Sequence, residues 1–83
     1  MNQPADETET PLVVDLSGLN CPLPVLKTKA ALAREPAGTL LEVVVTHPDS
    51  VREFEVLCKA DSLKLEAFIE QDGRFIYRIR KLK

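Results

Sequence analysis

The chain has 83 residues, of which 45% are hydrophobic and 29% are charged, and its formal net charge is -2. A chain of this size forms one small domain that buries about two thirds of its unfolded surface, which argues against a large internal cofactor pocket. The charge balance argues against a dominant nucleic-acid-binding role, and no apolar run approaches the roughly 20 residues that span a membrane.

Residues 1–10 predict a disordered acidic tail, and residues 11–83 predict a single domain. The tail contains three acidic residues and no large apolar residue beyond the initiator, so it cannot bury enough surface to order itself. Two cysteines cannot form a disulfide framework, and the first residues carry no basic or apolar leader. We therefore expect the chain to stay in a reducing cytoplasm.

The most informative stretch is DLSGLNCPLP at residues 15–24, where a strand is predicted to end and a helix to begin. Residues 13–16 have the character of the end of a buried strand, and Gly18 permits a sharp turn. Proline is favoured at the first helical position, because its ring fixes φ near the helical value and its missing N–H would have no partner there. Pro22 is therefore placed at the first helical position, with Cys21 as the N-cap.

In this position the sulfur of Cys21 would lie at the positive end of the helix dipole, which stabilises an anion by about 0.3 to 1 kcal/mol and by up to about 2 in sheltered geometry. At about 1.36 kcal/mol per unit, the pKa of the thiol could fall from about 8.5 to about 7. Pro24 has no N–H, so Leu23 and Val25 remain as backbone donors. We expect a rigidly held, accessible thiol that receives and hands on a group.

The first helix is predicted from Pro22 to about Glu35. Its apolar face is assigned to Val25, Leu26, Ala30, Leu32 and Ala33. Lys29 falls inside this arc, either as a lysine whose stem covers the core edge or as a cation that contacts a partner.

Residues 40–46 are nearly continuous in apolar and β-branched character, which predicts a central strand parallel to the first strand. The second helix is predicted from Pro48 to about Ala60. Cys58 lies on its apolar face and is interpreted as a small buried hydrophobe, which makes it an inert cysteine.

The last residues predict a β-hairpin around Gln71-Asp72-Gly73. A two-residue Asp-Gly loop would send Phe75 and Tyr77 to the wrong face, so we predict a three-residue loop with Gly73 left-handed. The predicted cross-strand pairs are Ile69 with Phe75, Ala67 with Tyr77, Leu65 with Ile79, Glu66 with Arg78 and Glu70 with Arg74. The side chains predicted on the open face of the sheet are Lys64, Glu66, Phe68, Glu70, Ile76, Arg78 and Arg80.

The pattern Asp-x-x-Gly-Leu-x-Cys-Pro-x-Pro, followed by Val-Leu and by Lys29, resembles the signature of the TusA/SirA/YedF family of small bacterial sulfur carriers. The resemblance runs from about Val13 to Lys81. It implies an α+β two-layer sandwich of order β-α-β-α-β-β, with a mixed sheet of strand order 1-2-4-3 and two helices on one face. It also implies that Cys21 accepts persulfide sulfur from a cysteine desulfurase or a rhodanese-like donor and relays it to an acceptor protein in tRNA 2-thiolation or sulfur oxidation.

On this interpretation Cys21 is the reactive residue, in a persulfide relay rather than an enzyme with independent turnover. The residues predicted to shape the site are Asp15, Gly18, Leu19, Pro22 and Pro24. Leu23 and Lys29 are the predicted partner-binding residues. We expect no cofactor, no metal, no direct nucleic-acid contact, no membrane association and a monomeric state.

The only histidine, His47, occupies a position where the family usually has an acidic residue before the proline. It is interpreted either as a proton carrier near Cys21 or as an ordinary loop residue. Two other function classes stay open. One is a thiol redox switch in which Cys21 pairs with Cys58 or another chain, and the other is a regulatory interaction module without sulfur chemistry.

Overall fold

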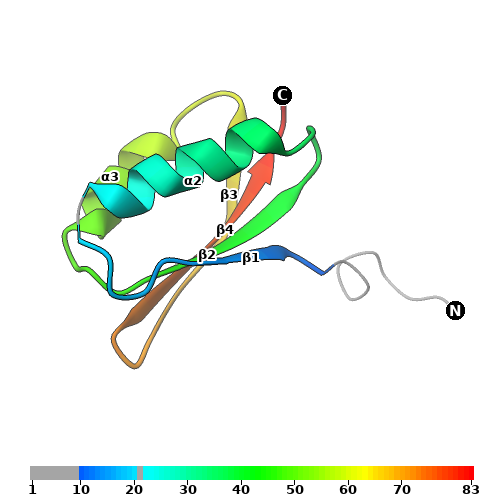
Figure 1. The fold of residues 1–83 in the computed structure, drawn as a ribbon. Helices are drawn as coiled ribbons and strands as arrows, with labels where there is room; N and C mark the ends of the chain where they lie inside the picture. Colours follow the sequence, from blue (N-terminus) through cyan, green and yellow to red (C-terminus); the bar gives the residue numbers. More distant parts are fainter. Residues whose placement is uncertain (1–9, 21) are drawn as a thin grey trace, which may run out of the picture.

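A computed structural model describes residues 10–20 and 22–83, so the predicted tail lies almost entirely outside the described residues. The elements are β1 (Leu12–Asp15), α2 (Leu23–Arg34), β2 (Leu40–Val45), α3 (Ser50–Leu57), β3 (Leu63–Gln71) and β4 (Arg74–Lys81). The sheet order is β1-β2-β4-β3, with β1 parallel to β2 and β4 antiparallel to both of its neighbours. Both helices cover one face of this sheet (Figure 1), which confirms the predicted α+β sandwich.

Two elements differ from their predictions, β1 in its burial and α3 in its first and last residues. β1 is exposed rather than buried, with Leu12 at 43% and Val13 at 56%, because it is an edge strand with β2 as its neighbour. α3 begins at Ser50 instead of Pro48 and ends at Leu57 instead of near residue 60. Its start is fixed by a turn, since the N–H and Oγ of Ser50 donate to the carbonyl of His47 at 3.0 and 2.7 Å.

α2 turns a different set of side chains to the core from the set predicted. Its buried residues are Pro24, Thr28, Ala31 and Leu32. Thr28 can be buried because its Oγ1 donates to the carbonyl of Pro24 at 2.8 Å, so the hydroxyl has a partner. Leu26, predicted to be in the core, is 53% exposed, and Lys29 is exposed as well.

The hairpin has a two-residue loop, so the predicted three-residue loop was wrong. Gln71 pairs with Arg74, and the loop residues Asp72 and Gly73 both have positive φ, at 54° and 79°. Positive φ at both loop positions is the geometry that matches the twist of hairpin strands, and Asp-Gly is one of the sequences that favours it.

A β-bulge between Leu65 and Ala67 corrects the register that this short loop imposes. The extra residue in β3 restores the predicted pairing of Leu65 with Ile79. Between the bulge and the loop the faces are exchanged, so Phe68 packs against Tyr77, with ring centroids 4.9 Å apart, instead of facing water with the open side of the sheet. The predicted pairs that prove wrong are Ile69 with Phe75, Ala67 with Tyr77, Glu66 with Arg78 and Glu70 with Arg74.

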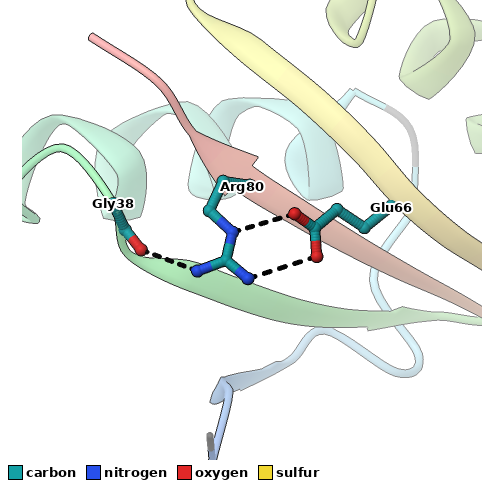
Figure 2. Close-up of polar contacts among 3 residues, drawn as sticks. All are labelled: Gly38, Glu66 and Arg80. Carbon is teal, nitrogen blue, oxygen red and sulfur yellow. Dashed lines mark hydrogen bonds and ion pairs between the residues drawn. The ribbon is translucent and has the colours of Figure 1, made fainter. Parts of the chain in front are cut away.

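Basic residues of β4 make contacts within the molecule. Arg80 binds both carboxylate oxygens of Glu66, at 2.9 and 3.2 Å, and donates to the carbonyl of Gly38 at 2.9 Å (Figure 2). Arg78 pairs with Glu42 at 3.0 Å. The Nζ of Lys81 donates to two carbonyls at the end of α2, those of Leu32 at 2.8 Å and Glu35 at 2.7 Å. Because Arg78, Arg80 and Lys81 are engaged in these contacts, they do not form an unpaired basic surface.

The core lies between the helices and the sheet. Its buried members are Leu16, Ala31, Leu32, Leu41, Val43, Val45, Phe54, Tyr77 and Ile79. The ring of Phe54 stacks on that of Tyr77 with centroids 4.6 Å apart. The Tyr77 hydroxyl is buried without a hydrogen-bond partner among the described residues. Burial, with smaller contributions from nearby acidic groups including Cys58, raises the pKa of Tyr77 to about 12.

This burial predicts an alkaline transition that can be monitored directly, because Tyr77 is the only tyrosine and the chain has no tryptophan. The tyrosinate absorbance of the folded protein should titrate near pH 12, against an ordinary pKa of 10.0 in the unfolded chain. Since the pKa is raised by folding, the stabilisation is complete below pH 10.0 and is lost as the pH rises toward 12. Titration in buffer and in concentrated urea tests this, and equal midpoints in the two solvents would contradict it.

Candidate functional site

The turn from β1 into α2 and the turn from β2 into α3 lie at the same edge of the sheet (Figure 1). β1 and β2 are parallel, so their carboxyl ends are neighbours, and Leu16 N–H donates to the carbonyl of Val44 at 2.8 Å. One step further, Gly18 N–H donates to Oγ1 of Thr46 at 2.8 Å. The loop that leads to Cys21 is therefore fastened to the end of β2.

The predicted residues before the cysteine form the first half of this turn. Asp15 is exposed and accepts from the N–H and Oγ of Ser17 at 3.1 and 2.6 Å, and these bonds hold the pKa of its carboxyl below the usual value. Gly18 has φ +84°, a left-handed conformation. Leu19 packs against the core, and its N–H donates to the carbonyl of Leu16 at 3.2 Å.

Cys21 itself lies outside the described residues, whereas Asn20 and Pro22 on either side of it are described and exposed. α2 begins at Leu23, with Pro22 as its N-cap, so the assignment of Cys21 as N-cap was wrong. The reason is the hydrogen bonding, because the carbonyl of Pro22 accepts from Leu26 N–H at 3.2 Å and so takes the N-cap role.

Few backbone N–H groups at the start of α2 are free to donate a hydrogen bond to an anion. Pro22 and Pro24 have no N–H, and Leu23 N–H donates to the carbonyl of Asn20 at 2.9 Å. Leu23 was predicted to be a donor to the sulfur, and the structure corrects this. The first turn of α2 contains no acidic side chain, so the positive end of the helix dipole is not neutralised there.

The two predicted partner-binding residues lie apart on α2. Leu23 is 44% exposed at the start of the helix. Lys29 is exposed about 9 Å further along the helix axis, at about 1.5 Å per residue. It borders a shallow hollow between α2 and α3, whose other lining residues are Val25, Arg52, Glu53, Val56 and Leu57. The site-shaping residues and Leu23 therefore gather around the turn, and Lys29 belongs to the neighbouring helix surface.

Cys58 and His47 occupy the two ends of the α3 region. Cys58 is the C-cap of α3 and is half-buried, and burial raises the pKa of its thiol. The Nδ1 atom of His47 accepts from Asp49 N–H at 3.2 Å. Within residues 10–20 and 22–83, no three His, Cys, Asp or Glu side chains lie close enough to hold a metal ion. In the same residues no helix has the length and apolar character needed to span a bilayer.

Sequence reasoning missed two residues that build the turn, Ser17 and Thr46. Ser17 binds Asp15, and Thr46 accepts the Gly18 N–H. The signal for Thr46 was its position directly after β2, because a parallel partner of β1 must place its first loop residues beside those of β1.

Gly18 allows a direct test of the turn. A Cβ added at Gly18 would meet no heavy atom within 4 Å, so the cost of Gly18→Ala comes from the backbone conformation alone. We expect Gly18→Ala to lower the free energy of unfolding by about 1 kcal/mol, and Gly18→Asn by less, because asparagine tolerates the left-handed region. Urea denaturation measures both variants. Equal losses for Ala and Asn would show that this conformation is not what glycine supplies.

The fold and the turn define a class, that of small α+β proteins with a cysteine between the first strand and the first helix. The family model described as Sulfurtransferase TusA matches residues 12–81. The chain is 40% identical over 68 residues to the sulfur carrier protein TusA of Allochromatium vinosum, covering 82% of this chain and 90% of that protein. It is 33% identical over 81 residues to the TusA protein of Pseudomonas savastanoi pv. phaseolicola, covering 98% and 96%.

A solved structure agrees with these sequence matches. The crystal structure of a SirA-like protein from Desulfitobacterium hafniense superposes with a TM-score of 0.73 at 27% identity, covering 87% of this chain and 99% of that chain. The chain belongs to the TusA family of sulfur carrier proteins.

Proposed function

We propose that Cys21 carries sulfur as a persulfide, which it accepts from a cysteine desulfurase or a rhodanese-like donor and passes to an acceptor protein. The observation that carries the proposal is the loop that leads to Cys21, which Gly18 fastens to the end of β2, in a chain of the TusA family whose residues Asn20 and Pro22, next to Cys21 in the sequence, are exposed. Asp15, Gly18, Leu19, Pro22 and Pro24 shape this turn. The pathway is tRNA 2-thiolation or sulfur oxidation, in the cytoplasm.

The transfer is an exchange between sulfur atoms. The thiolate of Cys21 attacks the outer sulfur of the donor persulfide, and the donor cysteine leaves as a thiolate while a new S–S bond forms on Cys21. An acceptor thiolate then attacks the outer sulfur of the Cys21 persulfide, and Cys21 leaves as a thiolate. Each step forms one S–S bond and breaks one, so no external oxidant, metal or cofactor is required. The rate depends on the thiolate fraction of Cys21 and on access to it.

An apolar surface beside the turn suits contact with the donor and acceptor proteins. Leu23 and Leu26 on α2 and Val56 on α3 are 44%, 53% and 65% exposed, and Lys29 and Arg52 lie along the same two helices. A transient partner gains affinity from apolar area at the centre and specificity from charges at the rim. We assign Leu23 and Lys29 to this docking surface.

The docking assignment predicts a selective effect of Leu23→Ser. We expect it to raise the donor concentration needed for half-maximal sulfur loading by about tenfold, because truncating an interface anchor costs more than about 1 kcal/mol. Alkylation of Cys21 by a small reagent should not change. Val13→Ser, at 56% exposure on the edge strand β1, is the matched control. An equal loss in both variants would remove Leu23 from the docking surface.

The experiment for the proposed function is incubation with a cysteine desulfurase and cysteine, followed by measurement of the intact mass. The protein should gain the mass of one sulfur atom, and a reductant should remove it. A protein that never gains a reducible sulfur, or that gains it equally as Cys21→Ser, would exclude the carrier function.

The redox switch is the second candidate, and the environment of Cys58 disfavours it. A resolving thiol reacts as its thiolate, and burial raises the pKa of Cys58, which lowers its thiolate fraction at neutral pH. Direct nucleic-acid binding is disfavoured by the pairing of Arg78 and Arg80 with carboxylates. We propose that the carrier acts as a monomer.

A further inference from the structure

The aromatic residues of the chain form one cluster between α3 and the hairpin. The sequence contains three phenylalanines, one tyrosine and no tryptophan. The ring of Tyr77 stacks on that of Phe54, with centroids 4.6 Å apart, and lies tilted against that of Phe68 at 4.9 Å. The rings of Phe68 and Phe75 are nearly parallel, with centroids 6.4 Å apart. Phe68 is 45% exposed, so the cluster reaches the protein surface at β3, an edge strand of the sheet.

A hollow of about 110 Å³ lies at this cluster, between α3 and β3. Its lining residues are Val51, Phe54, Glu55, Leu65, Phe68 and Tyr77. A water molecule takes about 30 Å³ in the liquid, so the hollow has room for a group of about four heavy atoms. None of the lining residues is basic, and Glu55 is the only charged one. The hollow therefore offers aromatic surface beside a carboxylate.

Two carboxylates border this aromatic surface. Glu55 is exposed on α3, and Glu70 is exposed on β3. Glu70 lies two residues after Phe68 with no bulge between them, so both side chains leave β3 on the same face. After burial and the Cys58 thiol, these two carboxylates are the further causes of the raised pKa of Tyr77, because a nearby negative charge disfavours tyrosinate. Within the described part of the chain, neither carboxylate forms an ion pair.

Aromatic faces beside carboxylates form a site that attracts an organic cation. A cation within about 6 Å of a ring centre is attracted to the face of the ring, and a guanidinium group stacks on rings because it is planar and weakly hydrated. We propose that this hollow binds the arginine side chain of a partner protein, with the guanidinium group against the ring of Phe68 and between the carboxylates of Glu55 and Glu70. The site contains none of the residues of the proposed sulfur transfer, so it stands whether or not the chain carries sulfur.

The test is an NMR titration with N-acetylarginine methylamide, compared with N-acetylcitrulline methylamide, which has nearly the same shape but no charge. The arginine probe should shift the amide signals of Val51 and Phe68, and its Kd should be about tenfold lower than that of the citrulline probe. Glu55→Gln and Glu70→Gln should each weaken binding of the arginine probe by about twofold, and together they should reduce the preference for arginine to about twofold. Phe68→Leu keeps an apolar contact but removes the ring, and should weaken binding by about twofold.

Asp61→Asn is the matched control, because it removes one negative charge at an exposed position that does not line the hollow. It should bind the arginine probe as tightly as the unchanged protein does. Equal Kd values for the two probes would overturn the proposal, and so would undiminished binding by Phe68→Leu. A loss in Asp61→Asn as large as that in Glu55→Gln would assign the effect to net charge and would also overturn it. The amide spectra show at the same time whether each variant is folded.

Discussion

Cys21→Ser is expected to abolish sulfur loading, whereas Cys58→Ser is expected to load at a rate within about twofold of the unchanged protein. The attacking group is a thiolate, and a serine hydroxyl stays protonated at neutral pH without an activating base. Cys58 is half-buried with a raised pKa, so its removal takes away a poorly reactive thiol. The measurement is the initial rate of loading by a cysteine desulfurase.

The reverse pattern would assign the sulfur to Cys58. Loss of loading in both variants would show that loading requires both thiols, which would contradict the assignment of Cys58 as inert. Far-ultraviolet circular dichroism of each variant shows whether a loss of loading reflects a loss of fold instead of a loss of the nucleophile.

Phe54→Ala is expected to lower the free energy of unfolding by about 3 to 5 kcal/mol, the range for removing a fully buried aromatic side chain. Phe54 is 0% exposed and stacks on Tyr77 at the centre of the core. Val56→Ala, two residues away on the same helix and 65% exposed, should change the stability by less than about 0.5 kcal/mol. Urea denaturation of the two variants measures the difference.

The size of the Phe54 effect has a functional consequence. The free energy of unfolding of a domain is typically about 5 to 15 kcal/mol, so a loss of this size would remove much of the stability of the folded state. Sulfur loading by Phe54→Ala should then fall with temperature in step with the folded fraction, and return on cooling. A Phe54→Ala protein as stable as Val56→Ala would mean that α3 is not packed as the structure has it.

The parallel pairing of β1 with β2 could be predicted from the residues because its signals are local, whereas the strand order 1-2-4-3 was implied by the resemblance to the TusA/SirA/YedF family. The apolar run of β2 indicated a central parallel strand, and the order of helices and strands allowed few arrangements. The hairpin could not be predicted in full, because two correct rules conflicted there. The Asp-Gly sequence favours a hairpin loop of two residues, whereas the core requires Tyr77 to face inward. The bulge between Leu65 and Ala67 makes the two compatible. No sequence pattern marked that bulge.

The position of the candidate site was predictable, but its hydrogen bonding was not. Gly18 and the prolines marked a turn between a strand and a helix from composition alone. The first helical bond, from Leu26 to Pro22, shifted the N-cap by one residue, and such a shift lies within the usual uncertainty of helix ends. The contact between Gly18 and Thr46 joins residues that are 28 positions apart, so it depends on the register of β1 against β2.

The measurement that tests the central claim most directly is fragment mass spectrometry of the protein after loading by a cysteine desulfurase and trapping with an alkylating reagent. The additional sulfur should be found on the fragment that contains Cys21, with an alkylated but sulfur-free Cys58 in the same sample. Additional sulfur on the Cys58 fragment, or an equal amount on both fragments, would contradict the assignment of Cys21 as the sulfur-carrying residue.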